Sequence, residues 1–557
     1  MKKNEQYELD ITDLGTDGEG IGKADGFTFF VEGALPGERV RILAVKVKKS
    51  YGYGKLLEVL TPSPHRVEPP CPVFRRCGGC ALQHLSYEAQ LDWKTKLVAD
   101  ALTRIGGVEN PPVSRCLGMV EPYAYRNKAQ FPLRGVNGRP TAGFFSARSH
   151  TLVPVDDCRI QHPANTAILR VLQEFLAEFS IPCYDEKTHT GLVRHVLTRA
   201  ARQTGEIMVC VVVNGKKLPY ADVLAARLSA ALDGRLTGLI LNLNRARTNV
   251  ILGADCQTLW GKPAVTEIIG GLRFEISPLS FFQVNPVQTE VLYATALSLA
   301  DVRPTDAVAD IYCGIGTMSL LFAQRAQSVV GVELVAQAVA DASQNAAANG
   351  IPNTSFVADY AEKALPTLAA ERGEGFDIVV LDPPRRGCDP AVLDACVALA
   401  PRTIVYVSCD PATLARDVKL LAACDYIVRE VQPVDMFPQT PHVETVVALS
   451  HKKADRYITV DVEFGEGEGQ IPLDDIAKRA ETQKPKGRAT YAMIQAYIEG
   501  KYGFKVHTAY IAEVKRALGL PMFDAPNAVE ELKQPRQHPT ERQTEAIQDA
   551  LMHFGII

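Results

Sequence analysis

The sequence predicts a multidomain α/β protein, and three observations support that fold class. The chain has 557 residues, which is several times the length of an ordinary single-core domain. Hydrophobic residues make up 46% of the chain and charged residues 22%, as in globular proteins. Short β-rich runs come first, and strands alternate with helices later. We therefore expect four segments, at residues 1–62, 63–275, 276–450 and 451–557.

Charge and cysteine content limit the classes of function. The 60 basic and 64 acidic residues give a net charge of −4, so any nucleic-acid binding must depend on local patches. No apolar run approaches the ~18 residues of a membrane span, and we expect a cytoplasmic protein without a membrane or an obligatory protein partner. Thirteen cysteines without a signal peptide favour free thiols, metal ligands or a nucleophile over a disulfide framework.

Residues 1–62 are predicted to form a small β-barrel. Four β-rich runs, at 7–11, 27–31, 39–47 and 56–60, are separated by turns rich in Gly and Asp. Between Arg39 and Leu57 there are six basic residues and no acidic residue, with Tyr51 and Tyr53 among them. Such a surface can follow a phosphate backbone and stack bases, although lysines that protect an ordinary edge strand are an alternative explanation.

The segment 276–450 contains signals of a nucleoside-binding sheet. A strand at 307–312 ends in Cys313-Gly314-Ile315-Gly316-Thr317, and the next strand delivers Glu333, whose carboxylate can accept hydrogen bonds from ribose hydroxyls. A later strand ends at Asp382-Pro383-Pro384. Because position 319 is Ser, the third glycine of a dinucleotide motif is missing. The pattern therefore favours S-adenosylmethionine over a dinucleotide.

Cys409 follows the fifth strand of this segment, at 403–407, and precedes a helix. It should face the same crevice, where the helix start would favour its thiolate, although most cysteines are simply buried small residues. A thiolate added to carbon 6 of uracil makes carbon 5 nucleophilic enough to accept a methyl group. His442 and Glu444 precede the last strand, and Glu444 is either the base that removes the carbon-5 proton or a surface carboxylate.

Five motifs together resemble the RNA uracil-C5 methyltransferases. They are Phe281-Phe282-Gln283-Val284-Asn285, the loop 310–316, Asp382-Pro383-Pro384-Arg385, Ser408-Cys409-Asp410-Pro411 and His442-Val443-Glu444. The resemblance implies a Rossmann-like class I methyltransferase sheet at 276–450 and an OB-like TRAM barrel at 1–62. It also implies that Cys409 is the nucleophile and Glu444 the base. The residues it assigns to S-adenosylmethionine binding are Gln283, Tyr312, Glu333 and Asp382.

The family resemblance also bears on the RNA substrate. Members with the barrel modify large-subunit ribosomal RNA, so 23S rRNA is the expected substrate, with tRNA as the alternative. Residues 451–557 fall outside the family pattern. We expect a helical extension there, with helices near 489–498 and 509–518 after a turn-rich run at 465–469. It is either an added RNA-binding module or a packing appendage.

A dense cysteine cluster lies near the start of the central segment. Cys71, Cys77 and Cys80 are close in sequence, which favours metal ligation over chance thiols. Cys158 is the best candidate for a fourth ligand, and the family places an iron–sulfur cysteine at its motif. Zinc usually prefers two short cysteine pairs, so we expect a [4Fe-4S] cluster with a structural or RNA-positioning role. Residues 63–275 would then be a central α+β iron–sulfur domain.

Two other functions are alternatives to RNA uracil methylation. A methyltransferase acting on the exocyclic amine of adenine would have an aromatic residue after Asp-Pro-Pro, where this chain has Arg385, and would not need Cys409. A non-catalytic iron–sulfur RNA-binding protein would be expected to lose some catalytic and cofactor residues, whereas all of those named above are present.

Overall fold

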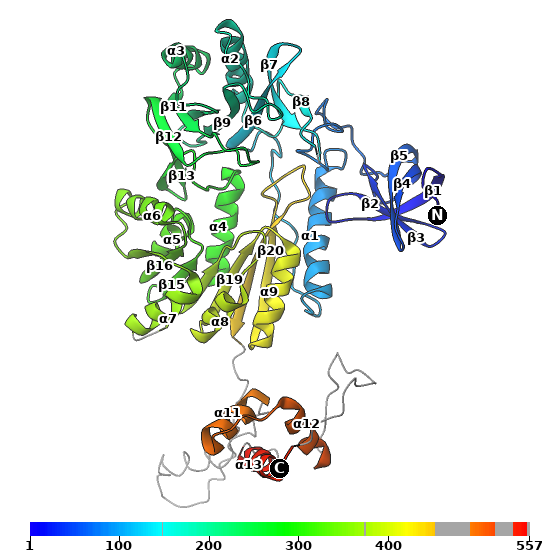
Figure 1. Ribbon diagram of the computed structural model, residues 1–557, viewed down its shortest axis with the longest axis vertical. Helices are drawn as coiled ribbons and strands as arrows, with labels where there is room; N and C mark the ends of the chain where they lie inside the picture. Colours follow the sequence, from blue (N-terminus) through cyan, green and yellow to red (C-terminus); the bar gives the residue numbers. More distant parts are fainter. Residues whose placement is uncertain (148, 373–374, 452–490, 519–538, 554–557) are drawn as a thin grey trace, which may run out of the picture. The chain divides into compact units, whose positions relative to one another are not determined.

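The computed structural model consists of two compact units, residues 1–453 and residues 454–557 (Figure 1). The structure describes residues 1–147, 149–372, 375–451, 491–518 and 539–553. The first unit contains a barrel and two large sheets. The second is described separately at the end of this section.

Residues 6–61 form a closed barrel, as predicted, and its strand order is β1-β2-β3-β5-β4. The strands are β1 (Gln6–Leu14), β2 (Gly20–Ala24), β3 (Phe27–Glu32), β4 (Arg39–Val47) and β5 (Tyr51–Thr61). Strand β2 was not predicted, because its glycines lower β propensity. They are required by close packing, since a Cβ at Gly20 would lie 2.7 Å from the carbonyl oxygen of Ala34.

The alternation of Tyr and Gly in β5 separates the two faces of the barrel wall. A Cβ at Gly52 would lie 2.7 Å from the ring of Phe29, which is fully buried in the barrel core. Successive side chains of a strand point to opposite faces, so Tyr51 and Tyr53 lie on the outer face. Strands β4 and β5 are each paired with two neighbours. Lys55 is paired on both sides, but β1 pairs only with residues 39–43 of β4, so the edge-strand explanation stays an alternative for Lys46, Lys48 and Lys49.

The central region contains a seven-stranded mixed sheet with order β12-β11-β10-β9-β6-β7-β8. Every residue of β9 and β10 is buried, because both faces of the sheet are covered. Helices α2 (Ala164–Glu178) and α3 (Ala221–Ala231) share one hydrophobic cluster with this sheet. Its strands are β6 (Lys128–Val136), β7 (Arg139–Phe145), β8 (Leu152–Pro154), β9 (Val193–Ala200), β10 (Ile207–Val213), β11 (Leu236–Leu243) and β12 (Asp255–Gly261).

Helix α1 (Tyr87–Arg104) precedes this central sheet in the chain but packs elsewhere. Its apolar residues Leu91, Val98 and Leu102 belong to a cluster with Tyr406 of the last sheet, and the helix lies against α9. The chain therefore crosses between regions within the segment 63–275. The boundaries at residues 62 and 275 stay predictions.

A hairpin of β13 (Val265–Ile269) and β14 (Leu272–Ile276) leads through the loop 277–285 into α4 (Pro286–Ala300). Asn285 caps α4, accepting a hydrogen bond from the Gln288 amide. This loop contains Gln283, and Asn285 at its end donates to the Met436 carbonyl, just beyond β20 of the last sheet, at 3.1 Å.

The last sheet has the order β17-β16-β15-β18-β19-β21-β20. Strands β15 to β19 are parallel, as predicted. The strands are β15 (Ala307–Ile311), β16 (Ser328–Glu333), β17 (Thr354–Ala358), β18 (Ile378–Leu381), β19 (Thr403–Ser408), β20 (Tyr426–Val434) and β21 (Glu444–His451). The helices of this sheet are α5 (Thr317–Ala323), α6 (Ala336–Ala348), α7 (Ala361–Arg372), α8 (Pro390–Ala398) and α9 (Pro411–Ala423).

The direction of β21 is the feature of this sheet that matters most for the site. It runs antiparallel between β19 and β20, with Ser408 opposite Thr445. The amino end of β21 therefore meets the carboxyl end of β19.

The described part of the second unit is helical, as predicted. Helices α11 (Tyr491–Tyr502) and α12 (Thr508–Ala517) match the two expected helices, and α13 (Glu541–His553) was not predicted. Each of the three helices contributes an isoleucine to a shared core, and these are Ile494, Ile511 and Ile547. The predicted turn-rich run at 465–469 lies outside the described residues. Among those that are described, no helix is both long and apolar enough to cross a membrane.

Candidate active site and cysteine cavity

Glu333 is held beside the glycine loop that follows β15. The amides of Gly314 and Val335 donate to its two carboxylate oxygens at 3.2 and 2.9 Å. Gly316 has φ +79°, and a Cβ there would meet Ala342 at 3.0 Å, so the turn requires glycine. The turn and the carboxylate therefore lie side by side, and the role of Glu333 in holding a ribose stays a prediction.

A row of carboxyl groups continues from Glu333 along this edge of the sheet. Burial raises the pKa of Asp310 to about 7, and Glu333 adds to the shift. Burial and then Asp310 raise the pKa of Asp382 to about 7. Burial and then Asp382 raise the pKa of Glu444 to about 8. Each carboxyl therefore disfavours ionisation of the next, and a positive charge beside them would be stabilised.

Cys409 lies at the end of this row, as predicted. Burial, Glu444 and Asp382 raise the pKa of its thiol to about 12. The prediction that the helix start favours the thiolate is therefore wrong for the protein alone. The Asp410 carboxylate already accepts from the first free amides of α9, those of Ala412 and Thr413, at 2.9 Å each.

Two further residues that interact with Cys409 or Glu444 were not assigned roles from the sequence. The positive charge of Arg385 offsets part of the rise in the pKa of both Cys409 and Glu444. Its position after Asp382-Pro383-Pro384 was a signal that could have identified it. Tyr293 is buried on α4, and Asp382, Asp310 and Glu444 all raise its pKa further above the usual value. In the sequence, Tyr293 lies within an apolar helix, and no motif marks it as a site residue.

The other two predicted cofactor residues lie on different elements. Gln283 is buried in the loop 277–285, and its carbonyl accepts from the Asn127 side chain at 3.1 Å. Tyr312 has φ +67°, and its side chain packs on the hydrophobic cluster that contains α1. Burial and the neighbouring Cys388 raise the pKa of Tyr312. The cofactor-binding roles of Gln283 and Tyr312 stay predictions.

The four predicted metal-ligand cysteines line one cavity. Cys71, Cys77, Cys80 and Cys158 surround a space of about 170 Å³. None of the thirteen cysteines forms a disulfide. Burial raises the pKa of Cys80 to about 12 and that of Cys158 to about 11. In the part of the chain that the structure describes, no three His, Cys, Asp or Glu side chains are arranged to hold a metal ion.

The wall of this cavity also contains buried polar atoms without hydrogen-bond partners. These atoms are Gln83 Oε1, Arg126 Nε and Gln161 Oε1. Buried polar atoms are rarely left unpaired in a native protein, so their presence is consistent with a bound group in the cavity.

Comparisons with known proteins agree with this architecture. Residues 270–452 match the family model of tRNA (uracil-5-)-methyltransferases, and residues 2–57 match the TRAM domain. An RNA methyltransferase of Clostridium tetani is 47% identical over 451 residues, covering 81% of this chain and 97% of the relative. One of Halalkalibacterium halodurans is also 47% identical, over 452 residues, covering 81% of this chain and 98% of the relative.

A solved structure extends the match to three dimensions. It is the crystal structure of Pyrococcus abyssi tRNA (uracil-54, C5)-methyltransferase in complex with S-adenosyl-L-homocysteine. It has a TM-score of 0.66 and 28% identity, and the match covers 80% of this chain and all of the other. With the two close relatives, this shows that the chain belongs to the tRNA (uracil-5-)-methyltransferase family and is an S-adenosylmethionine-dependent RNA methyltransferase with an amino-terminal TRAM domain.

Proposed function

We propose that the enzyme methylates carbon 5 of a uridine in 23S rRNA through a covalent bond between Cys409 and carbon 6. The observation that carries this proposal is the reversed strand β21, which brings the buried carboxyl of Glu444 beside Cys409. A nucleophile and a base at one edge of the sheet are the two groups that the reaction needs.

The chemistry balances with these two residues. Cys409 gives up its thiol proton to solvent, its sulfur bonds to carbon 6, and the electron pair of the carbon 5–carbon 6 double bond moves into an enolate. S-adenosylmethionine, when bound, would supply the methyl group to carbon 5 from its sulfonium, with its methyl carbon–sulfur bond breaking and S-adenosylhomocysteine leaving. The Glu444 carboxylate then removes the carbon-5 proton, the double bond re-forms, and the bond to Cys409 breaks. Glu333 would hold the ribose, and the row of carboxyls from Asp310 to Glu444 would favour the positive charge of the sulfonium.

Substitution of the two reacting residues separates the halves of this mechanism. Cys409→Ala should give neither product nor adduct, while it still binds S-adenosylmethionine through residues on other strands. Glu444→Gln should form the methylated adduct but fail to resolve it, so that RNA stays covalently attached to the protein. Denaturing gel electrophoresis with labelled RNA measures the attached fraction.

RNA with 5-fluorouridine at the target site provides an independent check, because fluorine cannot leave as a proton. The wild-type enzyme should then form a complex that resists denaturant. If no such complex forms, or if Cys409→Ala still methylates RNA, the covalent mechanism is wrong.

The burial of Glu444 also predicts a pH-dependent change in stability. Its pKa in the folded protein, about 8, lies above the usual value, so the folded state holds this proton more tightly than the unfolded state does. This contribution is fully present below about pH 4, near the usual Glu pKa, and is lost as the pH rises through about 8. Glu444→Gln should therefore melt at a higher temperature than the wild type at pH 8.5, with a smaller difference at pH 5.

Calorimetry at the two pH values tests this expectation. Glu430→Gln is the matched control, because Glu430 is exposed on the neighbouring strand β20. Equal pH dependence in Glu444→Gln and the wild type would show that Glu444 is not a buried proton-holding group.

The cysteine cavity supports a second part of the proposal, a [4Fe-4S] cluster held by Cys71, Cys77, Cys80 and Cys158. The residues fit such a group, since four cysteines line one cavity and one unpartnered polar atom at its wall, Arg126 Nε, can donate a hydrogen bond to sulfur. The methylation itself needs no electron transfer, so the group would supply structure or RNA positioning.

Removal of one cavity cysteine tests the cluster directly. Protein purified without oxygen should be brown and contain iron and sulfide, and Cys77→Ser should lose both. Cys256→Ser is the control, because this exposed cysteine lies outside the cavity. Stoichiometric zinc without iron or sulfide in the wild-type protein would contradict the proposal.

The outer surface of the barrel is relevant to the identity of the RNA substrate. Rings of Phe30, Tyr51 and Tyr53 lie 5.6 to 5.8 Å apart, and Lys48 lies over the ring of Tyr51 at 5.1 Å. This aromatic and basic surface is suited to a single-stranded RNA segment. The tRNA alternative is favoured by the activity of the Pyrococcus abyssi enzyme, a tRNA (uracil-54, C5)-methyltransferase. Mass mapping of 5-methyluridine in both RNA classes, from cells with and without this protein, distinguishes the two substrates.

Neutralising the exposed barrel lysines should weaken binding without changing the chemistry. We expect Lys46→Gln with Lys55→Gln to lower RNA affinity and to reduce the slope of log affinity against log salt by about one per lost phosphate contact. Turnover of bound RNA should stay near the wild-type rate. Lys216→Gln with Lys217→Gln removes two exposed lysines elsewhere as a control, and an unchanged slope in the barrel variant would place RNA on another surface.

A further inference from the structure

The loop 435–443 joins β20 to β21 and ends at Glu444. It contains no helix or strand, and Gln439 has φ +71°, a conformation that costs energy in a residue other than glycine. Such a loop keeps its shape only if its surroundings hold it. The position of the predicted base therefore depends on what contacts this loop.

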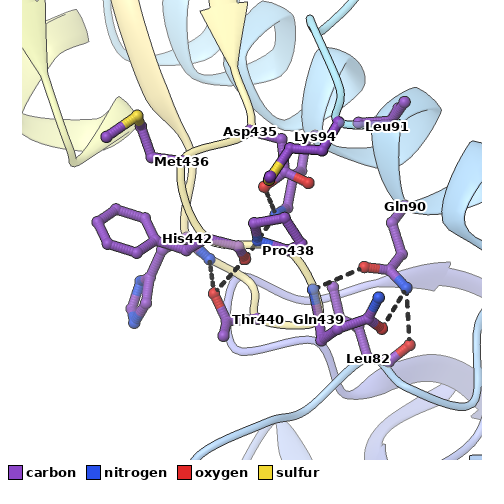
Figure 2. Close-up of polar contacts among 12 residues, drawn as sticks. Leu82, Gln90, Leu91, Lys94, Asp435, Met436, Pro438, Gln439, Thr440 and His442 are labelled. Atoms are coloured by element: carbon purple, nitrogen blue, oxygen red, sulfur yellow. Dashed lines mark hydrogen bonds and ion pairs between the residues drawn. The ribbon is translucent and has the colours of Figure 1, made fainter. Parts of the chain in front are cut away.

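Gln90 of helix α1 holds the middle of the loop. Its Nε2 donates to Gln439 Oε1 at 3.0 Å, and the Gln439 backbone amide donates to Gln90 Oε1 at 3.1 Å. Figure 2 shows this reciprocal pair beside Leu82. Both glutamines are buried, so neither side chain has ready access to water as a replacement partner.

Lys94, one turn further along α1, holds the start of the loop. Its Nζ lies 2.5 Å from Asp435 Oδ1, and both side chains are 0% exposed (Figure 2). The same Nζ donates to the Phe437 carbonyl at 3.2 Å, and the Tyr87 hydroxyl donates to Asp435 Oδ2 at 2.9 Å. Tyr87, Gln90 and Lys94 are spaced three and four residues apart, so they share one face of the helix.

The segment after Cys80 completes the arrangement. The backbone amides of Ala81 and Leu82 both donate to the Gln439 carbonyl, at 3.1 and 3.0 Å. Gln90 Nε2 also donates to the Leu82 carbonyl at 3.1 Å. Gln439 is thus held both by helix α1 and by the segment that follows Cys80.

Burial of a lysine and a glutamine is unfavourable unless their hydrogen bonds are satisfied in a defined geometry. The apolar residues of α1 already attach the helix to the sheet, so the polar face serves another purpose. We infer that Gln90 and Lys94 are positioning residues that hold the loop 435–443 so that Glu444 reaches the carbon-5 proton. This inference rests on the proposed role of Glu444.

Gln90→Leu is the main test, because it removes the amide pair without adding charge. It should accumulate the methylated covalent adduct, as Glu444→Gln does, with adduct resolution slowed about 10- to 100-fold. Binding of S-adenosylmethionine, measured by calorimetry, and the rate of adduct formation should stay near the wild-type values. A general loss of structure would instead lower all of these together.

A second variant covers the case in which Gln90→Leu fails to fold. Lys94→Gln with Asp435→Asn removes both buried charges and keeps groups able to hydrogen bond. It should show the same slow resolution. Lys96→Gln is the matched control on the same helix, because Lys96 is half-exposed and pairs with Asp13 and Asp100. This control should resolve the adduct at the wild-type rate.

The outcomes distinguish the two proposals. If Glu444→Gln accumulates the adduct but the Gln90 variant and the Lys94–Asp435 double variant resolve it normally, the positioning role is wrong and the base assignment stands. A parallel loss of cofactor binding, adduct formation and resolution in both variants would also overturn the positioning role. If Glu444→Gln accumulates no adduct, the base assignment fails, and the inference about α1 fails with it.

Discussion

The antiparallel direction of β21 is the constraint on which the site depends. In a fully parallel sheet, residues before a strand lie at the edge opposite to residues that follow its neighbour. Because β21 is reversed, Glu444 at its amino end lies at the same edge as Cys409 beyond the carboxyl end of β19. Strand β20 makes this possible, since it carries the chain back across the sheet before β21 begins.

The electrostatics of that edge favour a cation over an additional anion. Asp310, Asp382 and Glu444 are crowded together, and burial raises their pKa values to between about 7 and about 8. The same surroundings oppose formation of the Cys409 thiolate, with Arg385 as a positive charge that acts in the other direction. A bound sulfonium would relieve the repulsion, so cofactor binding and activation of the two reacting groups would be linked.

The central segment does more than connect the barrel to the catalytic sheet. Its helix α1 contacts the loop that leads to Glu444, and Asn127 contacts the loop that carries Gln283. The chain next to Cys80 contacts the same loop 435–443 through Gln439. The cysteine cavity and the proposed methylation site are therefore connected by a few hydrogen bonds.

The sequence by itself determined the features that depend on local chemistry. Strand periods, turn glycines and the motifs at Glu333, Asp382 and Cys409 were predicted because neighbouring residues decide them. Strand β2 was not predicted, because its glycines are required by contacts with residues distant in the chain, such as Ala34. Only the tertiary structure decided the direction of β21, the raised pKa of Cys409 and the contacts of Gln90 and Lys94, because each depends on groups far apart in sequence whose separation and burial no local pattern encodes.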